Sequence, residues 1–126
     1  MIMSIRMNSD IPIYKQLVRQ IVNGIADGSL TPGEQLPTVR ALAEEIGVNV
    51  MTVNKAYQSL KKDGYIEADR RNGARVKTKI VQKGEISPDN LEVLQNIIME
   101  AKVNGVTKEA VIQKCRDFYN LEKENV

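Results

Sequence analysis

A short segment near the middle of the chain carries side chains that can recognise the edges of nucleic-acid bases. Asn54 can form a bidentate pair with adenine, and Lys55 can donate to guanine. Met51 and Thr52 precede them and can contact a thymine methyl group. These residues occupy the first turns of an expected helix, the part that enters the DNA major groove in helix-turn-helix proteins. The alternative is an ordinary solvent-exposed helix face.

Cationic side chains flank this segment on both sides. Arg40 can reach a phosphate or a base at the groove edge, or it can form an ion pair with Glu44 four residues later. The spacing alone does not distinguish these two roles. After the segment come Arg70, Arg71 and Arg75, which can neutralise phosphates along a neighbouring groove. We expect Arg71 to approach the minor groove. The alternative is that these arginines only keep a β-hairpin soluble, with Glu67 and Asp69 balancing their charge.

Three amphipathic helices are expected to position these side chains. Apolar residues recur at helical spacing over positions 12–27, and Asp10 is the expected N-cap of that helix. Two shorter helices follow, with Thr38 and Asn49 as their N-caps and with a tight turn at Gly47 between them. Two amphipathic helices joined by a turn of this kind are typical of a helix-turn-helix.

A β-hairpin, the wing, is predicted directly after the third helix. Its strands are expected over 65–68 and 75–79, and Asn72 with Gly73 forms a two-residue turn signal between them. The predicted DNA-contacting residues are Thr38, Arg40, Asn49, Met51, Thr52, Asn54, Lys55, Arg70, Arg71, Gly73 and Arg75. The fold class is therefore mainly α with a small β wing (α+β), a winged helix-turn-helix.

The C-terminal third is expected to form a helical hairpin. One helix opens at Ser87 and Pro88, and the other opens at Thr107. Roughly 40 residues cannot bury two wide apolar faces, so we expect them to pack on the first domain, on a second copy, or on both. The predicted dimerisation residues are Leu91, Leu94, Ile97, Ile98, Val111, Cys115 and Phe118. The expected domains are 1–80 for DNA binding and 81–126 for dimerisation.

Composition argues against several other functions. The chain has no His and one Cys, so a metal site or a general base is improbable, and we expect neither an enzyme nor a cofactor. Cys115 fits a buried apolar stripe better than a redox sensor. Positions 1–80 hold 12 Lys and Arg against 8 Asp and Glu, which favours a polyanionic partner for this half. No signal peptide or membrane span is visible, so the expected location is the cytoplasm.

The order of these motifs resembles the GntR family of bacterial regulators. The similarity runs over about residues 10–78, through the stretches Pro12–Leu17, Gly28–Ala43, Gly47–Asn49, Thr52–Tyr57 with Leu60, and Asp63–Ile66. The short C-terminal part is similar to the YtrA-type branch, whose members are short dimeric regulators, typically repressors and often linked to transporter operons. The resemblance implies that residues 86–122 dimerise the protein and that Arg40, the start of the third helix and Gly73 contact DNA.

The sequence thus predicts a homodimeric repressor that binds a palindromic operator in double-stranded DNA. A small-molecule effector could bind between the C-terminal part and the winged domain or at the dimer interface, and nothing in the sequence identifies it. The alternative function is a protein-interaction module with only nonspecific affinity for DNA. An RNA-binding role lacks the usual aromatic stacking platform.

Overall fold

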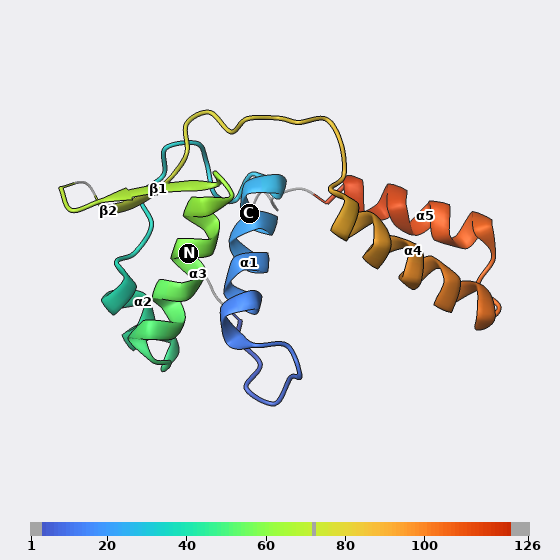
Figure 1. Ribbon diagram of the computed structural model, residues 1–126, viewed down its shortest axis with the longest axis horizontal. Helices are drawn as coiled ribbons and strands as arrows, with labels where there is room; N and C mark the ends of the chain where they lie inside the picture. Colours follow the sequence, from blue (N-terminus) through green and yellow to red (C-terminus); the bar gives the residue numbers. More distant parts are fainter. Residues whose placement is uncertain (1–3, 72, 122–126) are drawn as a thin grey trace. The chain divides into compact units, whose positions relative to one another are not determined.

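The computed structural model describes residues 4–71 and 73–121, which form two compact units. The first unit extends to Val81, and the second begins at Gln82. Figure 1 shows three helices and a two-stranded hairpin in the first unit and a pair of helices in the second. The architecture is a winged helix-turn-helix followed by a helical hairpin, as the sequence predicts.

The first unit is built around one apolar core. Its elements are α1 (Ile13–Asp27), α2 (Val39–Ile46), α3 (Val50–Lys62), β1 (Ile66–Asp69) and β2 (Gly73–Val76). Helices α1 and α3 lie side by side (Figure 1) and contribute six of the thirteen buried side chains in the core cluster. The largest fully buried residues are Leu17, Ile21, Leu42, Val53, Leu60, Ile66 and Val76. Aliphatic side chains therefore supply nearly all the packing, in keeping with the scarcity of aromatic residues.

Local signals place the helix ends in this unit correctly, with one exception. Thr38 and Asn49 are the N-caps of α2 and α3, and Gly28 ends α1 in the left-handed conformation with φ of 84°. The prediction of Asp10 as N-cap of α1 is wrong, because Pro12 occupies that position and no side chain caps the helix. The Pro12 carbonyl oxygen instead accepts from the Gln16 backbone at 3.2 Å.

The wing differs from its predicted strands and turn. β1 and β2 are antiparallel with Asp69 opposite Gly73, so the return strand starts at Gly73 and ends before Lys77. Gly73 is the first residue of β2, so the predicted two-residue turn of Asn72 and Gly73 is wrong; Asn72 itself lies outside the described residues. The Asp69 carboxylate accepts from the Arg71 backbone at 2.9 Å, and Gly73 has φ of 69°.

The second unit consists of α4 (Pro88–Val103) and α5 (Lys108–Tyr119). Ser87 and Thr107 cap these helices with their hydroxyl groups, as predicted, and Pro88 begins α4. Neither helix contains a fully buried residue in the single chain. The half-buried residues of the two helices are Ile98, Ala101 and Val111.

Candidate nucleic-acid interface

The turn between α2 and α3 is fixed by hydrogen bonds of its own backbone and of one cap. Gly47 adopts φ of 72°, which only glycine reaches without strain. The next amide, that of Val48, donates to the Ala43 carbonyl at 3.0 Å. The Asn49 side-chain oxygen then accepts from the Met51 amide at 2.7 Å and starts α3. The direction in which α3 leaves the turn is therefore set locally.

Tyr57 connects α3 to the segment that precedes α2. Its hydroxyl donates to the Pro37 carbonyl oxygen at 2.7 Å, and its side chain is buried. Burial disfavours the phenolate and raises the pKa of Tyr57 to about 12. The hydroxyl is therefore protonated at neutral pH and remains available as the donor.

The buried side of α3 leaves a continuous exposed face on the opposite side. Val53, Ala56, Tyr57 and Leu60 are buried, whereas Met51 is 78% exposed. Among the predicted base readers, Asn54 and Lys55 are exposed and Thr52 is half-buried. Exposed residues of mixed polarity on the first turns of α3 can bond or touch base edges in a major groove.

Two predicted contact residues already use one side-chain oxygen each to cap a helix. The Thr38 hydroxyl accepts from the Ala41 amide at 3.0 Å, and the Asn49 amide oxygen caps α3. Both residues remain exposed, so their backbone and their remaining polar atoms are still accessible. Arg40 is exposed in the first turn of α2.

The wing presents its cations on one face of the hairpin and at its tip. Arg70 and Arg71 are exposed between the strands, and the tip of the hairpin projects away from α1 and α3 (Figure 1). Arg75 is half-buried on β2, directly opposite Glu67. An opposite-charge pair across two strands is favourable, so Glu67 partly offsets the charge of Arg75.

A third extended segment holds the wing against the helix-turn-helix, and the sequence did not reveal it. The Leu36 amide donates to the Ala74 carbonyl at 2.8 Å, and the Val76 amide donates to the Glu34 carbonyl at 2.9 Å. The Gln35 side-chain amide adds a 3.3 Å bond to the Ala74 carbonyl. Because the connector that leads into α2 pairs with β2, the wing and the reading helix belong to one framework.

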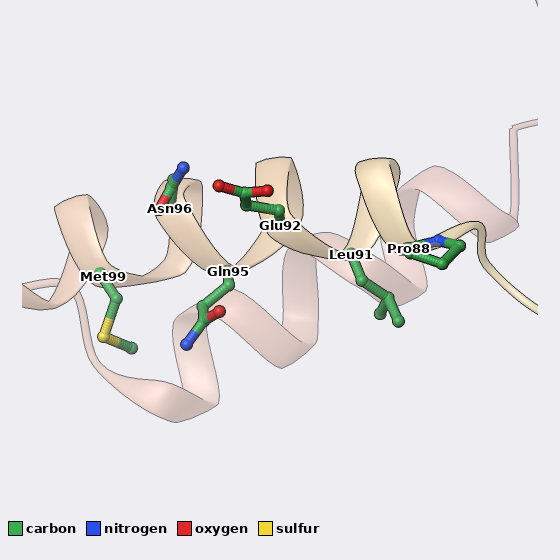
Figure 2. A pocket seen from close by; sticks show the side chains of 6 residues that line it. All are labelled: Pro88, Leu91, Glu92, Gln95, Asn96 and Met99. Atoms are coloured by element: carbon green, nitrogen blue, oxygen red, sulfur yellow. The ribbon is translucent and has the colours of Figure 1, made fainter.

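The predicted dimerisation residues lie in the second unit and are mostly exposed. Leu94 is 40% exposed and Phe118 is 66% exposed, while Ile98 and Val111 are half-buried. In Figure 2, Leu91, Gln95 and Met99 project from one side of α4 and, with Pro88, Glu92 and Asn96, line an open groove. Cys115 is exposed in the single chain, contrary to the expectation of a buried thiol.

Metal and membrane features are not found in the described parts of the chain. Residues 4–71 and 73–121 contain no group of His, Cys, Asp or Glu side chains that could hold a metal ion. Over the same residues, no helix has the length and apolar character needed to cross a membrane.

Comparison with known proteins decides which family carries this geometry. The family model described as bacterial regulatory proteins, gntR family, matches residues 13–76, the segment from the start of α1 to the end of the wing. The chain belongs to the GntR family.

Individual relatives of the GntR family extend the similarity into the second unit. The HTH-type transcriptional repressor YtrA of Bacillus subtilis is 36% identical over 87% of this chain and 86% of its own. The structure of YtrA from Sulfolobus acidocaldarius, a GntR-family transcription factor, has 38% identity and a TM-score of 0.63. The match covers 79% of this chain and 99% of that chain. A transcriptional antiterminator from Listeria monocytogenes has 27% identity and a TM-score of 0.80, covering 100% of this chain and 98% of that chain.

Membership of the GntR family assigns the helix-turn-helix and the wing to DNA binding. The protein is a transcriptional regulator, and the short second unit matches the YtrA-type members of the family. The named relatives are regulators of transcription and not enzymes.

Proposed function

We propose that two copies of this chain bind a palindromic operator and repress the adjacent genes. The observation that carries the proposal is the exposed face of α3, which starts at the Asn49 cap and presents Asn54 and Lys55, in a unit whose wing carries exposed Arg70 and Arg71. A helix held in this way can enter the major groove while the wing neutralises phosphates nearby. The proposed DNA contacts come from the start of α2, the first turns of α3 and the wing: Thr38, Arg40, Asn49, Met51, Thr52, Asn54, Lys55, Arg70, Arg71, Gly73 and Arg75.

The apolar surface of the second unit supports a homodimer. Ile97 and Phe118 are more than half exposed on two short helices that bury nothing completely. Exposing many large apolar side chains on one small unit is unfavourable for a monomer. A second copy of the same hairpin offers a matching surface, because a two-fold interface brings the same residues together from both chains.

A two-fold dimer fits a palindromic site. Two copies of α3 related by a two-fold axis would read two half-sites of opposite direction, separated by about one helical turn or roughly 10 bp. The name of the relative YtrA, a transcriptional repressor, supports repression as the outcome of binding. The resemblance to the YtrA-type branch supports a transporter operon as the target and the cytoplasm as the place of action.

Selection from a random duplex library at near-physiological salt tests this proposal with the purified full chain. We expect an enriched palindrome, and we expect the combined Arg40→Ala and Asn54→Ala variant to enrich nothing while it keeps the parent's thermal unfolding midpoint. Enrichment of no sequence by the parent, with strongly salt-dependent binding to all duplexes, would overturn the proposal. That result would favour a protein-interaction module with nonspecific DNA affinity.

A further inference from the structure

A contact between α1 and α3 involves one of the predicted base readers. The Lys55 ammonium nitrogen lies 4.1 Å from the centroid of the Tyr14 ring. At this distance the electron-rich face of the ring attracts a cation. Tyr14 is half-buried in the first turn of α1, whereas Lys55 is exposed. The ring therefore holds the end of a flexible side chain at the side of α3 that adjoins α1.

Lys55 lies at one edge of the exposed face of α3. Its neighbours at helical spacing are Thr52, three residues earlier, and Ser59, four residues later, and both are half-buried. Asn54 and Gln58 are exposed and lie farther from α1 around the helix. The exposed face is thus bordered on its α1 side by Lys55 and has Asn54 and Gln58 nearer its middle.

The two positions favour different DNA groups. A helix in the major groove turns the middle of its exposed face to base edges, while residues at its edges reach the phosphates that border the groove. The lysine ammonium is a compact point charge that suits a phosphate oxygen. A charge already held in place by an aromatic ring also loses less freedom when it binds.

We propose that Tyr14 positions Lys55 to bind a DNA phosphate at the α1 edge of α3, which leaves base recognition to Asn54 and its neighbours. This inference rests on the proposed function, in which α3 enters the major groove. It refines the expectation from sequence that Asn54 and Lys55 both read bases. Tyr14 acts through Lys55 and is a positioning residue.

A double-mutant cycle in DNA affinity tests the coupling between the two residues. Tyr14→Leu removes the aromatic face, and Tyr14→Phe keeps it. We expect Tyr14→Leu to weaken binding of the parent but to have no further effect in a Lys55→Ala background. Tyr14→Phe is expected to bind DNA like the parent. A Tyr14 role confined to folding would instead weaken both backgrounds equally, and that result would overturn the proposal.

Salt dependence and sequence selection identify the group that Lys55 contacts. A plot of log affinity against log salt concentration has a negative slope, and loss of one phosphate contact makes that slope less steep by about 0.9 per bound chain. We expect this decrease for Lys55→Ala, together with an unchanged preferred sequence. Lys83→Ala, which removes the same charge from the exposed linker, is the matched control and should keep the parent's slope.

The outcomes separate this inference from the proposed function. If the parent selects a palindrome but Lys55→Ala changes the preferred base and keeps the salt slope, Lys55 reads a base and the inference is wrong. If the parent selects no sequence, the proposed function fails, and the salt slopes on a fixed duplex still decide the phosphate contact. Equal salt slopes for Lys55→Ala and Lys83→Ala would overturn the proposed phosphate contact even if the parent selects no sequence.

Discussion

The Tyr57 hydroxyl donates a 2.7 Å hydrogen bond to the carbonyl oxygen of Pro37, a residue 20 positions earlier in the chain. This bond joins the middle of α3 to the segment just before the Thr38 cap of α2. The angle between the two helices of the helix-turn-helix therefore depends on one buried phenol as well as on the turn at Gly47.

Tyr57→Phe should reveal both the hydrogen bond and the raised pKa of this phenol. At neutral pH we expect the variant to lose about 1 kcal/mol of unfolding free energy, because the Pro37 carbonyl loses its donor. The folded-state pKa of Tyr57 is about 12, against 10.0 for an ordinary tyrosine. The unfolded chain thus releases this proton first, and Tyr57 loses stabilising effect as pH rises from 10 to 12, by about 1.4 kcal/mol per pH unit.

Urea unfolding of the parent and Tyr57→Phe at pH 7, 10 and 11.5 measures this effect. The difference between the two proteins isolates Tyr57 from the other groups that titrate in alkali. We expect the parent's advantage to be constant at neutral pH, to have begun to fall at pH 10, where half of the unfolded-state phenol is ionised, and to shrink further or reverse by pH 11.5. A difference that does not change with pH would show that the phenol ionises normally in the folded protein.

Gln16 holds the N-terminal segment of residues 4–11 against α1. Its side-chain oxygen accepts from the Arg6 amide, and its side-chain nitrogen donates to the carbonyls of Arg6 and Ile11, all at 2.9 Å. Gln16 is buried, whereas Gln20 is half-buried and makes a similar pair of bonds to Ser4 that are exposed to solvent. The buried set should contribute more to stability, because its partners cannot be replaced by water as easily.

Gln16→Ala is therefore expected to lower the unfolding free energy by roughly 1–3 kcal/mol. Gln20→Ala is the matched control and should cost less than half as much. Denaturant unfolding gives both values, and hydrogen exchange of the Arg6 amide reports whether the segment detaches. Equal losses for the two variants would contradict a special role for the buried glutamine.

Most helix boundaries could be predicted because their signals are local. Thr38, Asn49, Ser87 and Thr107 each stand immediately before an apolar periodicity, and each caps a helix. The exception is Asp10, where the cap signal lies in a segment that Gln16 holds by tertiary bonds.

The remaining errors and omissions involve contacts between distant parts of the chain. The register of the wing depends on the Asp69 carboxylate and on pairing of the connector with β2, which a local turn signal at Asn72 does not contain. Likewise, Tyr14 and Lys55 are far apart in sequence, so their contact requires the packing of α1 on α3. The expected burial of Cys115 is wrong for the single chain, because the apolar periodicity around it does not show that α4 and α5 leave this side chain exposed.

Gly73→Ala should destabilise the wing through its backbone conformation and, to a smaller extent, by displacing the flexible end of the Gln35 side chain. Gly73 has φ of 69°, and a Cβ atom there would lie 2.9 Å from the Gln35 side-chain nitrogen. The backbone conformation alone costs an alanine roughly 1–2 kcal/mol. Gly28→Ala is the matched control, because φ is 84° there and a Cβ would meet nothing within 4 Å.

Thermal unfolding and DNA affinity of these two glycine variants separate the effects. We expect Gly73→Ala to lose more stability than Gly28→Ala and, unlike it, to weaken DNA binding. Adding Gln35→Ala to Gly73→Ala removes the close contact but keeps the backbone strain. If Gly28→Ala and Gly73→Ala weaken DNA binding equally, the position of the wing does not matter for binding.

A lysine in the apolar face of the second unit should separate the proposed dimer. Leu94→Lys or Ile98→Lys would place an unpaired charge in the interface, which is strongly unfavourable. We expect monomers in analytical ultracentrifugation and a large loss of operator affinity, because one half-site then binds alone. Asn96→Lys adds the same charge on another side of α4 from Leu91 (Figure 2) and should remain dimeric. Monomeric parent protein at micromolar concentration would refute the dimer.

Arg40 offers the clearest separation between a DNA contact and a structural ion pair. If Arg40 binds DNA, Arg40→Ala should weaken operator binding by about 1–3 kcal/mol and change stability by less than about 0.5 kcal/mol. Glu44→Ala should then leave operator affinity unchanged or raise it, because it removes a nearby negative charge. If the two residues instead form an ion pair, both variants should lose a similar small stability of roughly 0.3–0.5 kcal/mol and bind DNA like the parent. Fluorescence anisotropy with an operator duplex, paired with urea unfolding of the same samples, distinguishes the two patterns.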